Sequence, residues 1–185
     1  MLISRFWKSL FSQEQKDKMA RYVPIQYSNF DLDSEGFIYT CTQTTKTSVD
    51  ELKKLNSQGI NILPTAKRNT GTEGDYGDLE KGWLNAKRVD TQFVDLCVDE
   101  DGFIYALDYT RGRIFQYDQE SRLLQVFGSV GAQAGTFKTP AAIDSLDGKL
   151  LVLDSGKCSV TVFEPTAFGS LVQEAVLLYH DGRYG

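Results

Sequence analysis

The sequence predicts a mainly β fold built from repeated small antiparallel sheets. Two observations support this prediction. The stretch "DLDSEGFIYTCT" at 31–42 returns as "CVDEDGFIYALD" at 97–108, and in both an acidic turn with a glycine precedes a short apolar strand. Short apolar runs separated by polar, glycine-containing turns also follow one another along most of the chain after Pro24. Such spacing is typical of strands joined by tight turns into antiparallel sheets.

The turn glycines indicate the repeat length. Gly102 and Gly148 are 46 residues apart, whereas Gly36 and Gly102 are 66 apart. A period in the forties with four strands per unit is typical of β-propeller blades. We therefore expect a partial β-propeller of about three four-stranded blades at 25–166, over about 26–63, 92–128 and 138–164, with a polar, Gly-rich insertion at 64–90. A closed ring takes four or more blades, so either further blades are missing or the three blades form an open arc. We expect the chain to be a fragment of a longer protein.

Each blade is predicted from its strands in order. The first has runs around Phe30–Leu32 and Phe37–Tyr39, followed by "VDELKKLN" and "INIL". The second reads "FVDLCV", "FIYALD", "RIFQYD" and "RLLQVFG", and the third reads "AAID", "KLLVLD" and "SVTVFE". No fourth strand is recognisable in the third blade. Acidic residues before glycine are expected to form the turns through side-chain to backbone hydrogen bonds, and glycine accepts positive φ there without strain.

Helical segments are expected at both ends. Apolar residues recur at steps of three and four in 1–11, and "SQEQ" resembles a capping box with Ser12 as N-cap, so 1–24 is predicted to be a helical, amphipathic segment. One interpretation is that this segment binds a membrane surface or a partner. The alternative, which we favour, is that it packs on its own domain. Over 167–185, helical spacing predicts a second helix, which Thr166 caps and Gly182 ends.

The blade core resembles the NHL-repeat family of β-propellers. The matching residues are Asp101-Gly102, Asp108, Arg113-Ile114, Phe127-Gly128, Gly131, Gly135-Thr136-Phe137 and Pro140, over 99–165. The tail resembles the first helix of a tetratricopeptide (TPR) repeat through Ala175, Gly182 and Tyr184. In the first blade Thr42 stands where Asp108 and Asp154 stand in the others. The combination is similar to bacterial propeller-plus-TPR proteins, which implies a cell-envelope location and no assigned activity.

Composition excludes several classes of function. A net charge of −5 argues against nucleic-acid binding, which needs a basic stripe. One histidine and three dispersed cysteines provide no zinc ligand set, and a buried Cys41 and Cys97 would act as small hydrophobes. The acidic turns lack the alternating pattern of a calcium loop. We therefore expect no metal, cofactor or catalytic residue, and neither a secretory signal nor a membrane span in this chain.

The candidate interaction residues lie in the insertion. Tyr76, Trp83, Lys87 and Arg88 combine aromatic and basic side chains, which are common interface anchors on loops of rigid folds. The alternative is a loop that covers a blade edge, with Trp83 in its own core. Blade-turn residues with an expected structural role are Gly36, Gly102, Asp108, Gly148 and Asp154.

The sequence thus predicts a non-enzymatic propeller scaffold that recognises a protein or a small ligand. The alternative is a truncated, lactonase-like metal-dependent hydrolase of the SMP-30/gluconolactonase type. Some NHL-like propellers resemble such lactonases, which hold a metal on the propeller axis with acids and an asparagine. No matching set of Glu, Asn and Asp is recognised on the inner strands, and His180 is placed outside the blades, so the hydrolase is the second hypothesis.

Overall fold

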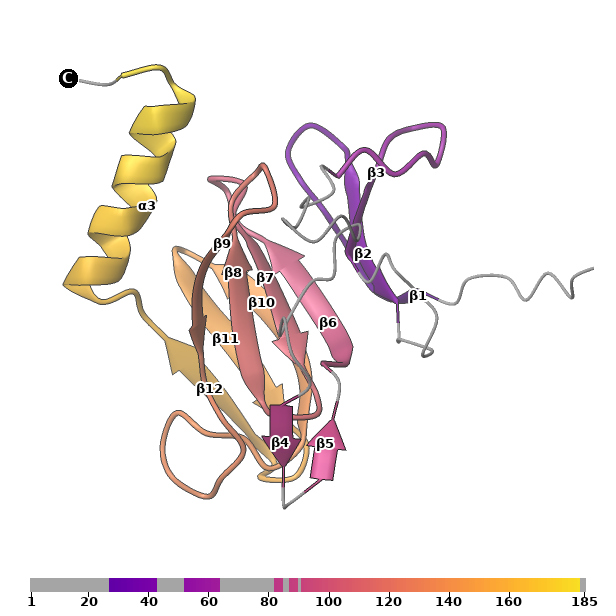
Figure 1. Cartoon of the computed structure of the whole chain (residues 1–185), viewed down its shortest axis with the longest axis vertical. Helices are drawn as coiled ribbons and strands as arrows, with labels where there is room; N and C mark the ends of the chain where they lie inside the picture. The colour runs from indigo at the N-terminus through magenta and orange to yellow at the C-terminus, as the bar shows by residue number, and fades with distance from the viewer. Residues whose placement is uncertain (1–26, 43–51, 64–81, 85–86, 90, 184–185) are drawn as a thin grey trace, which may run out of the picture.

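The computed structural model describes residues 27–42, 52–63, 82–84, 87–89 and 91–183, and it confirms a mainly β, partial propeller-like fold (Figure 1). The first sheet contains β1 (Tyr27–Leu32), β2 (Ile38–Thr42) and β3 (Leu52–Leu55). The second contains β6 (Phe93–Val98), β7 (Ile104–Asp108), β8 (Arg113–Tyr117) and β9 (Leu123–Phe127). The third contains β10 (Pro140–Leu146), β11 (Lys149–Asp154) and β12 (Ser159–Phe163). In all three, strands that follow one another in the chain pair antiparallel.

The doubled "GFIY" motif builds the same hairpin twice. The Asp33 carboxylate accepts the backbone N–H groups of Glu35 and Phe37 at 3.0 and 2.9 Å, and Gly36 has a φ of 83°. Asp99 accepts the N–H groups of Asp101 and Phe103 at 3.1 and 2.9 Å in the same way. The motif's tyrosine completes each turn, because Tyr39 donates to Asp33 and Tyr105 donates to Asp99, both at 3.1 Å. These contacts explain why the acid, the glycine and the tyrosine recur together.

The sheets stack face to face in chain order. The inner strand β6 of the second sheet contacts the inner strands β1 and β10 of its neighbours. We call the face of a sheet that points to the preceding sheet its leading face, and the opposite face its trailing face. One core joins Tyr39, Cys41 and Leu52 of the first trailing face to Leu96, Val98, Ile104, Ala106, Phe115 and Tyr117 of the second leading face. A second core joins Cys97, Tyr105, Leu107 and Ile114 to Ile143, Leu150 and Val152 of the third sheet.

The prediction of a fourth strand in the first blade is wrong. Of "INIL", only Asn61 forms an isolated bridge, to Leu55. The side-chain Oδ1 of Asn61 accepts the N–H groups of Lys54 and Leu63, each at 3.1 Å. A side chain that takes backbone donors in this way competes with a regular strand ladder. Within the described residues, therefore, only the second sheet has four strands.

The C-terminal helix α3 (Ala167–His180) begins and ends as predicted. The Thr166 hydroxyl accepts the Gly169 N–H at 3.1 Å, and Gly182 follows the helix with a φ of 70°. Val176 and Leu177 pack against the second core, so α3 lies beside the second and third sheets (Figure 1). No helix in the described part of the chain is long and apolar enough to cross a membrane. The helices predicted in 1–24 lie outside the described residues.

Candidate functional site

The predicted interaction residues in the insertion are only partly within the described structure. Trp83 belongs to β4 (Gly82–Leu84), and Lys87 and Arg88 belong to β5 (Lys87–Val89), which pair antiparallel as a two-stranded sheet. Tyr76 lies outside the described residues. The structure therefore places three of these residues on two paired strands, and their role in recognition stays a prediction.

Two buried aspartates end equivalent strands of the second and third sheets. Asp108 accepts the N–H groups of Gln92, Thr110 and Arg111 at 3.0, 2.9 and 3.2 Å. Asp154 accepts four N–H groups, from Lys138, Thr139, Gly156 and Lys157, at 2.7, 2.9, 3.0 and 3.2 Å. Each carboxylate thus joins two segments of its own sheet by hydrogen bonds. One is the turn directly after the aspartate, and the other is the segment directly before the inner strand, β6 or β10.

These two carboxylates differ in electrostatics although they share a register position. Burial raises the pKa of Asp108 above its ordinary value, and its N–H donors and the Arg111 charge offset only part of that rise. For Asp154 burial also opposes ionisation, but the four N–H groups outweigh it, and the pKa of Asp154 falls below its ordinary value. Each carboxylate bonds to backbone, so each has a structural role.

The inner strands carry an acid and asparagine cluster that the sequence patterns did not reveal. Asn29 and Asp31 on β1, Asp95 on β6 and Asp144 on β10 line one cavity of about 430 Å³, together with apolar residues such as Phe30 and Leu153. The cluster contains no glutamate, so it does not match the Glu, Asn and Asp set of the lactonases. The signal was present as one or two polar residues on each inner strand, at positions that only the register of the sheets brings together.

Most of this cluster is occupied by contacts between neighbouring sheets. Asp31 Oδ2 accepts the Val98 N–H at 2.7 Å, and Asp95 Oδ2 accepts the Ile143 N–H at 2.7 Å. Asn29 also donates to Asp95 through its side-chain amide. Burial raises the pKa of Asp95 overall, although these donors lower it in part. In the described part of the chain no three His, Cys, Asp or Glu side chains lie close enough to hold a metal ion. These carboxylates therefore fit an axial metal poorly.

A second cavity, of about 280 Å³, lies between the second and third sheets and the start of α3. Its walls include the apolar side chains of Phe127, Leu150, Phe163 and Pro165. Its polar lining includes Tyr105, Gln125, Glu164, Thr166 and Gln173. We call it the helix cavity. Its walls come from elements that are far apart in the sequence, so no local motif could have predicted it.

The polar side of the helix cavity is built around Tyr105. Its hydroxyl accepts the side-chain amides of Gln116 and Gln173, each at 3.0 Å, and donates to Asp99. Burial and the nearby Asp99 charge raise the pKa of Tyr105, so the hydroxyl stays protonated near neutral pH. Gln173 comes from α3, and this network therefore links the helix to the turn of the second sheet.

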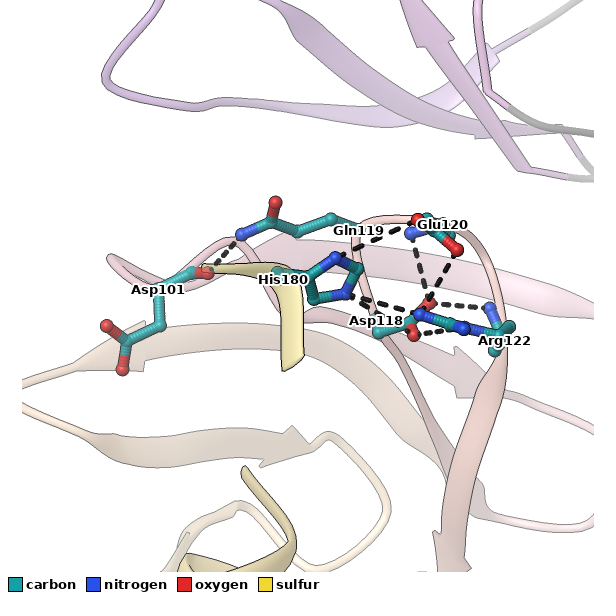
Figure 2. A network of polar contacts seen from close by, with 6 residues as sticks. All are labelled: Asp101, Asp118, Gln119, Glu120, Arg122 and His180. Carbon is teal, nitrogen blue, oxygen red and sulfur yellow. Dashed lines mark hydrogen bonds and ion pairs between the residues drawn. The ribbon is translucent and has the colours of Figure 1, made fainter. Parts of the chain in front are cut away.

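The end of α3 is held by a charged cluster at the turn between β8 and β9 (Figure 2). Arg122 Nε donates to Asp118 Oδ2 at 2.7 Å, and Arg122 Nη2 lies 3.1 Å from Glu120. His180 Nε2 lies 3.4 Å from Arg122 Nη2 and 3.7 Å from Asp118 Oδ2. The sequence placed His180 outside the blades, and in the structure it docks α3 onto the second sheet.

Comparisons with known proteins give matches among solved structures only. No protein-family model matches the sequence, and no curated protein matches it significantly. The chain is similar to a streptogramin B lyase, with 10% identity over 77% of this chain and 42% of the lyase and a TM-score of 0.42. It is similar to selenomethionine-substituted virginiamycin B lyase from Staphylococcus aureus, with 13% identity over 75% and 41% and a TM-score of 0.39. The chain spans less than half the length of these two structures.

Proposed function

We propose that this chain belongs to an NHL-type propeller that acts as a non-enzymatic recognition scaffold, and that the helix cavity receives an apolar group of a partner protein. The observation that carries the proposal is the cavity itself, which is mainly apolar with hydrogen-bonding groups at one side. Its volume of about 280 Å³ is near the lower end of small-molecule sites, roughly 300–1,000 Å³. One large side chain suits such a volume.

The surroundings of the helix cavity support a protein partner. Phe168 and Leu171 near the start of α3 are both exposed, at 75% and 63%. Exposed apolar residues beside a cavity are typical of protein interaction sites. The Tyr105 hydroxyl at the centre of the network already donates one hydrogen bond and accepts two. The mechanism is therefore recognition by a rigid surface, without bond chemistry.

Gly169 lines the helix cavity and provides the test of this proposal. It is the buried residue of α3, and a Cβ built on it would lie 3.5 Å from Thr166 Oγ1, which is ordinary contact. Glycine has a lower helix propensity than any residue except proline, so a larger residue at this position in the first turn of α3 does not weaken the helix. We expect Gly169→Leu to fill the cavity without lowering the free energy of unfolding.

Titration with indole as an apolar probe, followed by amide NMR, measures binding in the helix cavity. For the wild type we expect saturable shifts of the Gly128 and Gly169 amides and of the Gln173 side-chain amide. Gly169→Leu should abolish the shifts at Gly128 and Gln173, whereas Ser170→Leu, which adds the same side chain at an exposed neighbouring position, should retain them. Unsaturable shifts in the wild type, or binding retained in Gly169→Leu, would contradict a ligand role for the cavity.

The second candidate function is the lactonase-like hydrolase, for which the acid and asparagine cluster of the inner strands would be the metal site. A metal there would activate water, but Asp31 and Asp95 already accept backbone N–H groups of the neighbouring strands. Calorimetric titration with Ca²⁺ and a lactone-hydrolysis assay separate the two proposals. Stoichiometric metal binding together with turnover would overturn the scaffold.

The family resemblance also leads us to propose a cell-envelope location and a TPR-like role for α3. Membrane contact through 1–21 is the weaker part of this proposal. Vesicle flotation with a deletion of residues 1–21 tests it, because binding that survives the deletion would exclude that segment as the contact.

A further inference from the structure

The hydrogen bonds on the polar side of the helix cavity have a fixed direction, which is set by Asp99. The Asp99 carboxylate accepts the backbone N–H groups of Asp101 and Phe103 and the Tyr105 hydroxyl. Three donors to one side chain fit an ionised carboxylate, which accepts hydrogen bonds only. The one proton of the Tyr105 hydroxyl is therefore used toward Asp99, and every further partner of that hydroxyl must be a donor.

Three glutamines continue this direction toward the helix cavity. Gln116 and Gln173 both donate to the Tyr105 oxygen through Nε2, at 3.0 Å each. The Oε1 of the buried Gln116 in turn accepts the Nε2 group of Gln125. Each amide thus spends an N–H group on the partner that lies nearer to Asp99 along the network. The orientation of all three amides follows from the one acceptor at the buried end.

Two amide oxygens end the network at the wall of the helix cavity. Gln125 and Gln173 both line the cavity, and no described residue donates a hydrogen bond to the Oε1 atom of either. Glu164, the charged residue of the described lining, is also an acceptor and lies 2.6 Å from Lys149. Each amide keeps one further N–H, but each oxygen has two lone pairs, so acceptors are in excess. A ligand that covers these oxygens without a donor would leave them unpaired, which weakens binding.

The apolar walls of the helix cavity suit an aromatic ring. Phe127 and Phe163 line the cavity, and their ring centroids lie 5.5 Å apart with an angle of 60° between the ring planes. Phe163 also contacts the ring of Phe137 in the second core, at 5.9 Å between centroids. Aromatic rings pack edge-to-face or offset with centroids about 4.5–7 Å apart, so a further ring continues this arrangement. The cavity thus combines aromatic walls with hydrogen-bond acceptors.

We propose that the apolar group received by the helix cavity is the indole ring of a tryptophan on the partner protein, whose N–H donates to the amide oxygen of Gln125 or Gln173. This inference rests on the proposed function, because it specifies the group that the same cavity receives. Indole has one N–H donor and no acceptor, so it complements a wall of unpaired oxygens. A phenylalanine would leave both oxygens without a donor. Tryptophan is also enriched among the residues that contribute most to protein–protein binding.

Amide NMR titrations of the whole chain with indole and with benzofuran test this inference. Benzofuran has the same bicyclic shape but carries an oxygen in place of the N–H, and the amides of Gly128 and Gly169 report the binding of both probes. We expect indole to bind about tenfold more tightly, because benzofuran leaves an amide oxygen unpaired. Equal affinities, or tighter binding of benzofuran, would overturn the tryptophan assignment but not the cavity as an apolar site. Failure of both probes to saturate would overturn the proposed function together with this inference.

A double variant, Gln125→Met with Gln173→Met, separates the role of the oxygens from the shape of the cavity. Methionine is similar in length but has no amide, so we expect the preference for indole to fall to about twofold or less while benzofuran affinity is kept. Gln133→Met makes the same substitution at an exposed position outside the cavity and should keep the wild-type preference. Circular dichroism and thermal unfolding show whether each variant is folded. A tenfold preference that persists in the folded double variant would overturn the assignment to these oxygens.

Discussion

Gly128→Ala is expected to lower the free energy of unfolding by about 3 kcal/mol. Gly128 has a φ of 83°, and a Cβ on it would lie 2.8 Å from the Gly112 carbonyl oxygen and 3.1 Å from the Phe137 ring. The left-handed conformation alone costs an L-residue about 1–2 kcal/mol. The contact with backbone adds to this cost, because the carbonyl belongs to a turn that cannot move independently.

Gly36→Ala is the matched control for this prediction. Gly36 has the same φ of 83°, but a Cβ on it would have no neighbouring atom within 4 Å. We expect a loss of about 1 kcal/mol, from the conformational term alone. Urea unfolding at one fixed protein concentration measures both changes, because self-association would make the stability concentration-dependent. Equal losses in the two variants would show that the close approach to Gly112 does not contribute.

Asp154→Asn and Asp108→Asn are each expected to lower the free energy of unfolding by about 2 kcal/mol at neutral pH. An asparagine accepts hydrogen bonds through only one of its two terminal atoms. In Asp154 the second oxygen accepts the Lys138 N–H, and in Asp108 it accepts the Arg111 N–H. The substitution therefore leaves at least one backbone donor facing another donor. Asp101→Asn, at an exposed position, should have little effect.

The two variants should respond to pH in opposite directions. Because the pKa of Asp154 is lowered by folding, its stabilisation is present above the ordinary value near 3.9 and is lost as the pH falls through the lower folded value. The penalty of Asp154→Asn should therefore shrink on acidification. The pKa of Asp108 is raised by folding, so protonation favours the fold between about 3.9 and the raised value. The penalty of Asp108→Asn should grow over that window.

Urea unfolding between pH 7 and pH 3 measures both trends. The difference between wild type and variant is taken at each pH, which removes the contribution of every other titrating group. Parallel trends for the two variants would contradict the electrostatic difference between these equivalent positions.

Local sequence was sufficient to predict the structure wherever the contacts lie within a single hairpin or helix. The acid, glycine and tyrosine of the "GFIY" turns contact one another within a few residues, so their pattern is visible in the chain. The same holds for α3, which begins after Thr166 and ends before Gly182. The prediction of a fourth strand in the first blade was wrong for an equally local reason. The Asn61 side chain accepts the backbone N–H groups of Lys54 and Leu63, which a regular strand would pair with backbone carbonyl groups.

The candidate sites could not be predicted in this way. Asn29, Asp31 and Asp95 are each unremarkable in their own strands, and only sheet stacking brings them to one cavity. The helix cavity depends on how α3 packs, through Gln173 and Tyr105, onto a sheet that lies about 70 residues earlier in the chain. Long-range packing of this kind has no signature in a single sequence.

The sequence by itself determined the repeat, because turn chemistry and strand alternation act between neighbouring residues. It also determined that three blades are too few for a closed ring. Only the tertiary structure decided which face of each sheet is covered, since that depends on the register and stacking of strands from different repeats. The same apolar pattern is buried at Leu107 and exposed at Leu153, because the third sheet covers Leu107, whereas no sheet in the described part of the chain covers Leu153.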